Sequence, residues 1–323
     1  EYVSENNQFK GIKYLENGQE KYVEFCKKDD VVKSVSYDKE TEQLRIEVYT
    51  RLYTSIGSIK VINTIIPITI SEETSEEDEK LLEFCQRNSI SYFEVTESYF
   101  SHSLTRQRAI KKYCTSDIVI ILSQDVKLTD KNCFYNLVKD IHNKKCAYAY
   151  GRQLGPKRGV ERYIREKNYP SNSYFVSKED IQKMQIMAFF SSDAFSALDR
   201  NIFLEIDGFG ETDVFINEDM LYSYIILNAG YKKKYCADAI VSHYHKYTLN
   251  ELYNRYYKIG RFYTQVKVFD QYKSSQSGLK LALYVLRNAL LHFDILCLFR
   301  LPADMITRYI GFKAGKSFNE NKQ

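Results

Sequence analysis

Three polar clusters in the sequence carry side chains that could do chemistry together. Asp125 follows the apolar run Ile118 to Leu122, Glu218 and Asp219 stand together at the start of a helical pattern, and His243 and His245 are two residues apart. Carboxylate oxygens and imidazole nitrogens bind divalent cations such as Mg²⁺ or Mn²⁺. A carboxylate held away from the metal can accept a proton from an attacking hydroxyl. The three clusters together predict a metal and general-base centre.

Each cluster also has a simpler interpretation. An Asp at the end of a strand often only forms a turn, and acidic residues at a helix start cap the helix and favour its dipole. Paired histidines can be purely structural. Three arginines, Arg106, Arg152 and Arg255, could each bind phosphate through the guanidinium group. The simpler interpretation of each is an arginine on the surface that contacts only solvent. The order of the clusters along the chain favours the functional interpretation.

The elements that must position these clusters read as alternating strands and helices. The segment SDIVIILSQD predicts a buried strand that ends at Asp125. Residues 219–229 predict a helix ended by Gly230, AIVSHYH predicts a strand, and a long helix is expected after Thr248. Strand and helix alternate at spacings typical of an α/β fold with a mostly parallel sheet flanked by helices. The basic stretch 151–177 predicts a long irregular loop.

Composition narrows the class of protein. The chain has 323 residues and a net charge of +4, without the strong basic surplus of a nucleic-acid-binding domain, so no nucleic-acid partner is expected. Its seven cysteines are scattered without a C-x-x-C pair, and no secretory signal pattern opens the sequence. These features favour a reducing, cytoplasmic environment.

Three regions are expected along the chain. Residues 1–57 form a β-rich appendage with hairpins around Asn17-Gly18 and around residues 38–42, residues 58–250 form the catalytic domain, and residues 251–323 form a helical extension. Residues 279–301 are apolar but interrupted by charged residues, so they predict one amphipathic helix and no membrane span. The basic flanks favour contact with a membrane surface through residues 279–316.

The ordered motifs resemble those of a known family. TESYFSHSLTRQRAIKKYCTSDIVIILSQDVKLTD, AYGRQL with KNYP, and IDGFGETDVFINEDMLYSYIILNAGYKKKYCADAIVSHYHKYTLNELYNRYYKIGRFY are similar to the motif series of bacterial family 2 glycosyltransferases. Within that family the chain is most similar to the rhamnosyltransferase-like group of cell-surface polysaccharide synthesis. The resemblance covers about residues 91–262.

The resemblance implies a GT-A fold and a metal-dependent inverting transfer of a sugar, with rhamnose as a candidate. The donor would be a nucleotide-diphosphate sugar and the acceptor a glycan or a lipid-linked glycan. The transfer would take place in the cytoplasm, at the inner face of the cell membrane.

The resemblance also implies roles for individual residues. Ser123-Gln124-Asp125 stands where the family has its D-x-D-type motif, although Ser123 replaces the leading aspartate. The implied roles are a metal site with Mg²⁺ or Mn²⁺ at Asp125, His243 and His245, a general base at Asp219 with Glu218 beside it, and donor binding by Arg106, Gln124, Arg152 and Arg255.

Two alternatives remain open from the sequence. A catalytically degenerate domain of the same fold could bind glycans or act as a scaffold subunit, and it would show no metal-dependent nucleotide binding. A nucleotidyltransferase on a similar sheet would release pyrophosphate where a glycosyltransferase releases a nucleoside diphosphate.

Overall fold

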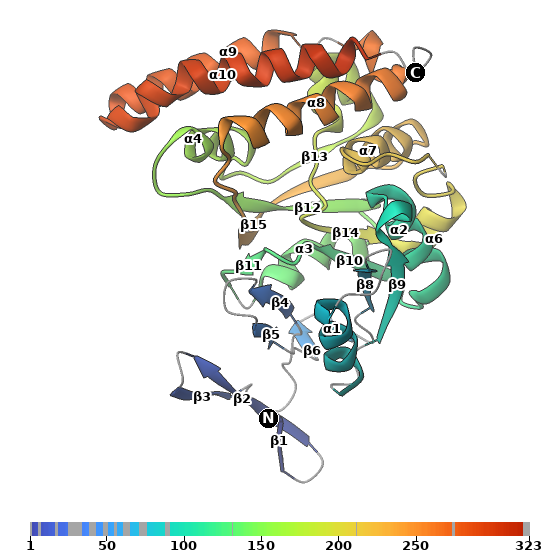
Figure 1. Cartoon of the computed structure of the whole chain (residues 1–323). Helices are drawn as coiled ribbons and strands as arrows, with labels where there is room; N and C mark the ends of the chain where they lie inside the picture. Colours follow the sequence, from blue (N-terminus) through green and yellow to red (C-terminus); the bar gives the residue numbers. More distant parts are fainter. Residues whose placement is uncertain are drawn as a thin grey trace. The chain divides into compact units, whose positions relative to one another are not determined.

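The structure is a computed structural model of the chain (Figure 1). It describes the backbone of the strands and the helix before residue 88, and then residues 91–318 except 131, 211, 273 and 274. Side chains are described from residue 79 onward, with Pro67, and leave out residues 88–90, 97, 131, 211 and 273–277.

The chain divides into two compact units, which are described separately. The first comprises Glu1–Ile66 with Glu79–Phe93, and the second comprises Pro67–Asp78 with Glu94–Gln323. The predicted region boundaries at residues 57 and 250 stay predictions. The elements up to residue 96, which precede the strands of the large six-stranded sheet, are β1 (Tyr2–Glu5), β2 (Gln8–Glu16), β3 (Gln19–Glu24), β4 (Ser34–Asp38), β5 (Gln43–Glu47), β6 (Arg51–Thr54), β7 (Gly57–Lys60), β8 (Ile65–Ile70), α1 (Glu76–Arg87) and β9 (Ser91–Thr96).

The predicted N-terminal hairpins are confirmed by strand pairing. β2 pairs antiparallel with β3 in a register that sets Glu16 opposite Gln19, and β4 pairs antiparallel with β5. A two-residue connection of the Asn-Gly type favours this tight hairpin. The turn residues Asn17 and Gly18, and residues 39–42 of the second hairpin, lie outside the described residues.

A six-stranded sheet forms the centre of the second unit. Its strands run in the order β10 (Ile118–Leu122), β14 (Phe195–Asp199), β12 (Tyr148–Leu154), β15 (Lys233–Ser242) and β11 (Lys127–Leu128), and β13 (Tyr174–Val176) also pairs with β15. The predicted α/β class, a central sheet flanked by helices, is confirmed. The expected mostly parallel arrangement is wrong for this sheet, since among its described pairings only β12 with β15 is parallel. The alternation of strands and helices did not reveal that β14 enters the sheet in the opposite direction, between β10 and β12.

Helices cover both faces of this sheet (Figure 1). Phe195 of β14 packs edge to face against Phe134 of α3 (Cys133–His142) on one face. On the other face Leu198 belongs to a buried cluster with Tyr148 and with Tyr222 of α7 (Glu218–Asn228). Successive residues of a strand point to opposite faces, and all residues of β14 are buried, so this strand is covered on both sides. The shorter helices of the unit are α2 (His102–Arg108), α5 (Ile181–Met184) and α6 (Arg200–Glu205).

The segment 151–177 is more regular than predicted. β12 continues to Leu154, and α4 (Val160–Asn168) begins after Gly159, whose φ of 90° suits a residue without a side chain. The basic residues that suggested a loop are divided between β12, the loop before α4 and α4 itself, while Tyr163 and Ile164 of α4 are buried against the C-terminal helices. The expectation of an irregular loop is therefore wrong for this helix.

The C-terminal region consists of α8 (Leu249–Gln265), α9 (Ser275–Leu291) and α10 (Ile295–Lys316). The single helix expected over 279–301 is broken at 292–294, where Phe293 has a φ of 51° and the Asp294 side chain caps α10 by accepting from Cys297 N–H. In the part of the chain that the structure describes, no helix combines the length and the hydrophobicity that a membrane span requires.

Candidate functional site

Asp125, His243 and His245 come together as the sequence predicted. Asp125 lies in the turn after β10, and the two histidines follow the last residue of β15. Each histidine Nε2 is 3.2 Å from Asp125 Oδ2. One ligand atom from each residue can be chosen so that all three lie within 4.8 Å of one another. This spacing is compatible with binding of one divalent cation by all three residues.

Gln153 of β12 fixes the orientation of His243. Its side-chain carbonyl Oε1 is 2.8 Å from His243 Nδ1 and also accepts from the guanidinium of Arg165. Arginine is only a donor, so the amide must present its oxygen on this side and His243 must carry its proton on Nδ1. The Nε2 lone pair then faces Asp125. Histidines that bind metals are commonly oriented by such a partner on the other nitrogen.

The electrostatics also suit a cation at this position. Burial opposes ionisation of Asp125, but a hydrogen bond from the protonated form of His243, with the charges of the protonated His243 and His245, holds the pKa of this carboxyl below its usual value. Burial lowers the pKa of His245, against the effect of Asp125. A deprotonated carboxylate and neutral imidazoles are the forms that ligate metals. The residues present therefore fit a divalent cation, with Mn²⁺ or Mg²⁺ as the expected ions.

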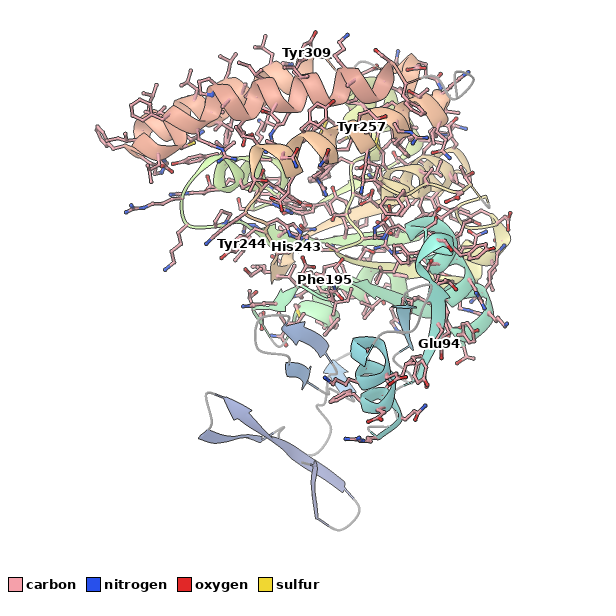
Figure 2. All side chains as sticks on the ribbon, viewed as in Figure 1. Glu94, Phe195, His243, Tyr244, Tyr257 and Tyr309 are labelled. Carbon is pink, nitrogen blue, oxygen red and sulfur yellow. The ribbon has the colours of Figure 1, made fainter. Side chains whose placement is uncertain are left out.

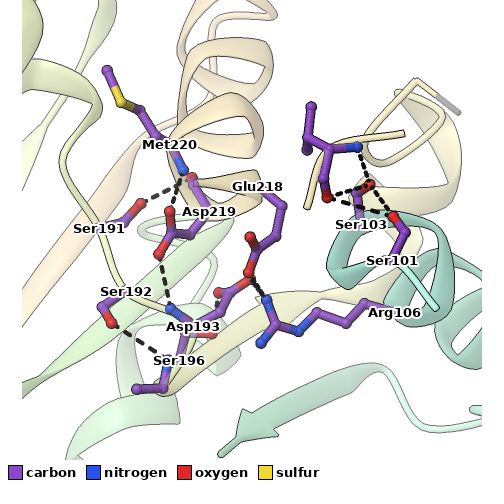
Figure 3. Close-up of polar contacts among 12 residues, drawn as sticks. Ser101, Ser103, Arg106, Ser191, Ser192, Asp193, Ser196, Glu218, Asp219 and Met220 are labelled. Carbon is purple, nitrogen blue, oxygen red and sulfur yellow. Dashed lines mark hydrogen bonds and ion pairs between the residues drawn. The ribbon is translucent and has the colours of Figure 1, made fainter. Parts of the chain in front are cut away.

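The second predicted group, Glu218 and Asp219, lies at the start of α7. The preceding residue, Asn217, has left-handed backbone angles (φ 61°, ψ 28°), which are uncommon for a residue other than glycine. Such backbone conformations are frequent at functional sites. This turn directs Glu218 and Asp219 toward the segment that precedes β14 (Figure 3).

Asp219 is held by backbone groups and is hard to ionise. Its Oδ1 accepts from Met220 N–H at 2.7 Å and its Oδ2 accepts from Asp193 N–H at 3.3 Å. Burial and the nearby charge of Asp193 raise the pKa of Asp219 to about 6, against the opposing charge of Arg106. A carboxylate with a pKa near neutrality suits a general base, because it is ionised at working pH and still has affinity for a proton.

Arg106 of α2 connects these carboxylates. Its guanidinium forms an ion pair with Glu218 and lies 3.3 Å from Asp193 Oδ2 (Figure 3). Asp193 Oδ1 also accepts from the Tyr148 hydroxyl at 2.6 Å and from the Ser196 hydroxyl at 2.5 Å. Both acids are buried, so the arginine offsets a charge that would otherwise be costly. Its predicted role in donor binding stays a prediction.

We call Asp125, His243 and His245 the metal cluster, after the cation that they could hold. A short series of hydrogen bonds joins this cluster to the carboxylates at the start of α7. His243 bonds Gln153, and Gln153 Nε2 donates to Ser192 Oγ at 2.7 Å. The next residue, Asp193, donates its backbone N–H to Asp219. The two predicted groups therefore belong to one connected polar site, built from the ends of β10, β12 and β15, the segment before β14 and the start of α7.

Three residues predicted to bind the donor remain: Gln124, Arg152 and Arg255. Arg255 of α8 is exposed, and its guanidinium lies 5.7 Å from the centroid of the Tyr247 ring, which is itself 5.3 Å from the ring of His245. Gln124 is an exposed residue beside Asp125, and Arg152 lies on β12 opposite Ile240 of β15. Arg255 and Gln124 thus border the metal cluster, and their role in donor binding stays a prediction, as does that of Arg152.

Three residues of the site, Gln153, Ser192 and Asp193, were missed in the sequence. A polar triplet, Ser191-Ser192-Asp193, is separated from the buried strand β14 by Ala194 alone, and this signal resembles the one that singled out Asp125. The sequence alone does not show that a sheet strand follows this triplet. An antiparallel strand brings its amino end to the same edge as the carboxyl ends of its neighbours.

Comparison with known proteins identifies relatives by sequence. No family model matches the chain. It is 36% identical over 193 residues to the O-antigen chain rhamnosyltransferase RfbN of Salmonella typhimurium, a match that covers 59% of this chain and 61% of RfbN. It is 31% identical over 206 residues to the O-antigen chain rhamnosyltransferase WbaN of Salmonella anatum, covering 63% of this chain and 64% of WbaN. The matches span less than two thirds of each relative. The predicted similarity to the rhamnosyltransferase-like group is confirmed.

Three solved structures were also found to be similar. The mannosyltransferase PcManGT from Pyrobaculum calidifontis, in complex with GDP-Man and Mn²⁺, has a TM-score of 0.42 at 13% identity over 79% of this chain and 67% of its own. GalNAc-T7 with UDP, GalNAc and Mn²⁺ has a TM-score of 0.40 at 14% identity over 61% and 44% of the two chains. S. aureus TarS has a TM-score of 0.40 at 12% identity over 80% and 66%.

Proposed function

We propose that this protein is an inverting glycosyltransferase of bacterial surface polysaccharide synthesis. It transfers a sugar, with rhamnose as the first candidate, from a nucleotide-diphosphate donor to a glycan or lipid-linked acceptor. The relatives RfbN and WbaN, both O-antigen chain rhamnosyltransferases, support this reaction class. The observation that carries the proposal is the connected site in which Asp125, His243 and His245 are joined through Gln153 to Asp219.

Asp125, His243 and His245 would hold the divalent cation. When bound, Mg²⁺ or Mn²⁺ supplies positive charge that neutralises the leaving diphosphate. Gln153 keeps the His243 lone pair directed at the ligand position. Arg255, Gln124 and Arg152 would add donor contacts around it, because guanidinium and amide groups bind phosphate oxygens.

Asp219 would act as the general base. The acceptor hydroxyl oxygen attacks the anomeric carbon, the bond from that carbon to the diphosphate oxygen breaks, and Asp219 takes the hydroxyl proton. A single displacement of this kind inverts the anomeric configuration. The neighbouring Glu218 is held in an ion pair with Arg106, so Asp219 is the carboxylate left to exchange a proton.

The reaction would take place in the cytoplasm, at the inner face of the cell membrane. A nucleotide-sugar donor is a cytoplasmic metabolite, and a lipid-linked acceptor is confined to the membrane. The catalytic domain would be residues 58–250, preceded by the appendage 1–57 and followed by the helical extension 251–323.

The test is a panel of nucleotide sugars with the wild-type protein and Asp219→Asn. We expect wild-type turnover with one donor, release of the nucleoside diphosphate, and loss of turnover in Asp219→Asn with donor binding retained. Unchanged transfer by Asp219→Asn would refute the base assignment, and full turnover in excess chelator would refute the metal. Absence of any Mn²⁺-dependent nucleotide binding in calorimetry would favour the scaffold alternative, and release of pyrophosphate would favour a nucleotidyltransferase.

A further inference from the structure

The turn between α9 and α10 exposes an unusual set of large apolar side chains. We name this set the apolar tip: Leu290, Leu291, Phe293, Ile295, Leu296 and Phe299. Between 55% and 86% of each residue is exposed to solvent. Single exposed apolar residues are normal on protein surfaces, but six within ten positions mark an interaction surface.

The tip is held outward by a well-packed base. Asp294 points inward, where its carboxylate accepts from Gly159 N–H at 2.8 Å and from Cys297 N–H at 3.1 Å. Behind it Val285 and Ala289 of α9 pack with Tyr163 of α4 in a buried cluster. The exposure of the tip is therefore a consequence of the folded arrangement, since the inner faces of both helices are already occupied.

Basic side chains predominate among the exposed charges near the tip, and the exposed Glu166 on the neighbouring α4 is paired with Arg162. Among the described side chains of α9 and α10, the exposed charged residues are all basic: Arg287 and Arg300 near the turn, Lys280 toward the start of α9, and Lys313 and Lys316 at the far end of α10, where Lys316 pairs with Asp270. The two acids, Asp294 and Asp304, are buried, and Asp304 pairs with Arg308. The nearby loop before α4 adds the exposed Lys157 and Arg158.

We propose that the apolar tip inserts into a bilayer that contains anionic lipids. An apolar surface with a cationic border matches the boundary between headgroups and acyl chains. A second copy of the chain fits less well, because pairing two tips would bring two cationic borders together. Other side chains on the outer side of these helices, including Tyr309, also point away from the rest of the unit (Figure 2).

A shallow, widely open hollow beside the tip has a lining of the same character. It has a volume of about 490 Å³ and opens between the first turn of α4 and the start of α10. Its walls are mostly apolar, and the cationic side chain of Arg300 is among its lining residues. An acyl or isoprenoid chain fits this lining better than a polar ligand does. The lining residues are Gly159, Val160, Leu296, Cys297, Phe299 and Arg300.

The tip is connected to the metal cluster. Arg300 donates to the Tyr247 carbonyl oxygen at 2.8 Å, and the Tyr247 ring contacts that of His245. On α4, Arg165 donates to Gln153, the partner of His243. A bilayer bound at the tip would thus lie at a fixed position relative to the site. This last step rests on the proposed function, since it concerns a lipid-linked acceptor.

The test is co-sedimentation of the full chain with vesicles, without donor or metal. We expect binding to phosphatidylcholine vesicles that contain phosphatidylglycerol, weak binding to phosphatidylcholine alone, and weakening by salt. Phe293→Ser with Phe299→Ser should lower binding at least about tenfold, whereas Leu204→Ser, an exposed apolar residue of α6, should not. Arg287→Glu should weaken binding to anionic vesicles, in contrast to the control Lys183→Glu on α5.

Both phenylalanines are more than 80% exposed, so the double variant should fold normally, which circular dichroism checks. Undiminished vesicle binding by this variant would overturn the proposal. The proposal would also be overturned if the wild-type protein bound neither kind of vesicle and formed a dimer, while the double variant was a monomer. Light scattering measures this difference. Calorimetry with Mn²⁺ and nucleoside diphosphates separates this outcome from a failure of the proposed function, because the tip variants should leave nucleotide binding unchanged.

Discussion

At the scale of single residues, the pKa of Asp219 makes a prediction about pH. A general base must be deprotonated, and the pKa of this carboxyl is raised to about 6 by burial and by Asp193. The rate of transfer should therefore fall as the pH drops through about 6 and be level above about 7. In Asp193→Asn the raising charge is absent, so the acidic limb of the profile should move to lower pH.

The control for this profile is Asp130→Asn, an exposed acid in the turn before α3. Its acidic limb should coincide with that of the wild type. A limb that stays in place in Asp193→Asn, with activity retained, would contradict the electrostatic link between the two acids. The asparagine keeps an oxygen for the Tyr148 and Ser196 hydroxyls, while its amide nitrogen replaces the oxygen that faces Arg106, so the change removes the charge together with that one contact.

Gln153 makes a second residue-scale prediction, on metal affinity. Gln153→Leu removes the acceptor that keeps the proton of His243 on Nδ1. Loss of such a partner typically lowers metal affinity by about 10 to 100-fold. Calorimetry in the presence of a nucleoside diphosphate measures the Mn²⁺ affinity of the variant. The matched control is Gln182→Leu, at an exposed glutamine. Equal affinities in the two variants would show that His243 needs no orienting partner.

Several members of the candidate site carry a signal in the sequence, and the structure brings Asp125 together with His243 and His245. Asp125, Asp219 and the two histidines are singled out by residue type, by position at the ends of elements and by their order. Gln153 could not be found in this way, because an isolated glutamine within a strand has no local signal. Its role depends on which strands are neighbours, and that pairing is set by tertiary structure.

At the scale of elements, the contact of α8 with α10 depends on glycines. A Cβ at Gly311 of α10 would lie 2.6 Å from the Tyr253 carbonyl oxygen of α8, closer than packed atoms approach. Gly311→Ala should lower the free energy of unfolding by about 1 to 3 kcal/mol, the usual cost of overpacking. Urea denaturation measures this loss.

Gly278→Ala is the matched control, since a Cβ there meets no atom within 4 Å. Alanine at an open helical position is expected to stabilise by about 0.4 to 1 kcal/mol. If both substitutions stabilised the protein to the same extent, the close packing of α8 on α10 would be refuted.

Element prediction succeeded where capping chemistry is local. The helix expected after Thr248 is present and begins with a capping box of Thr248 and Glu251, and Gly230, expected to end the preceding helix, follows α7 with a φ of 90°. It failed for residues 279–301, where the apolar pattern continues through the break between α9 and α10. The break depends on Asp294 binding Gly159, a contact between residues far apart in sequence.

At the scale of the whole molecule, the apolar tip and the metal cluster predict an activity that depends on how the acceptor is presented. An acceptor carried in anionic vesicles and bound by the tip would meet the site at a high effective concentration. Transfer to a lipid-linked acceptor should therefore be faster in anionic vesicles than in neutral ones. Transfer to a short soluble glycan should be equal in both.

The variant Phe293→Ser with Phe299→Ser separates docking from catalysis. It should lose most of the vesicle-dependent advantage while keeping the wild-type rate on the soluble glycan, because neither side chain contacts the metal ligands or Asp219. The measurement is the ratio of the two rates in each protein. Equal loss on both acceptors would mean that the tip supports the fold of the site. A wild-type ratio that does not depend on lipid charge would mean that the cationic border has no part in recruiting the acceptor.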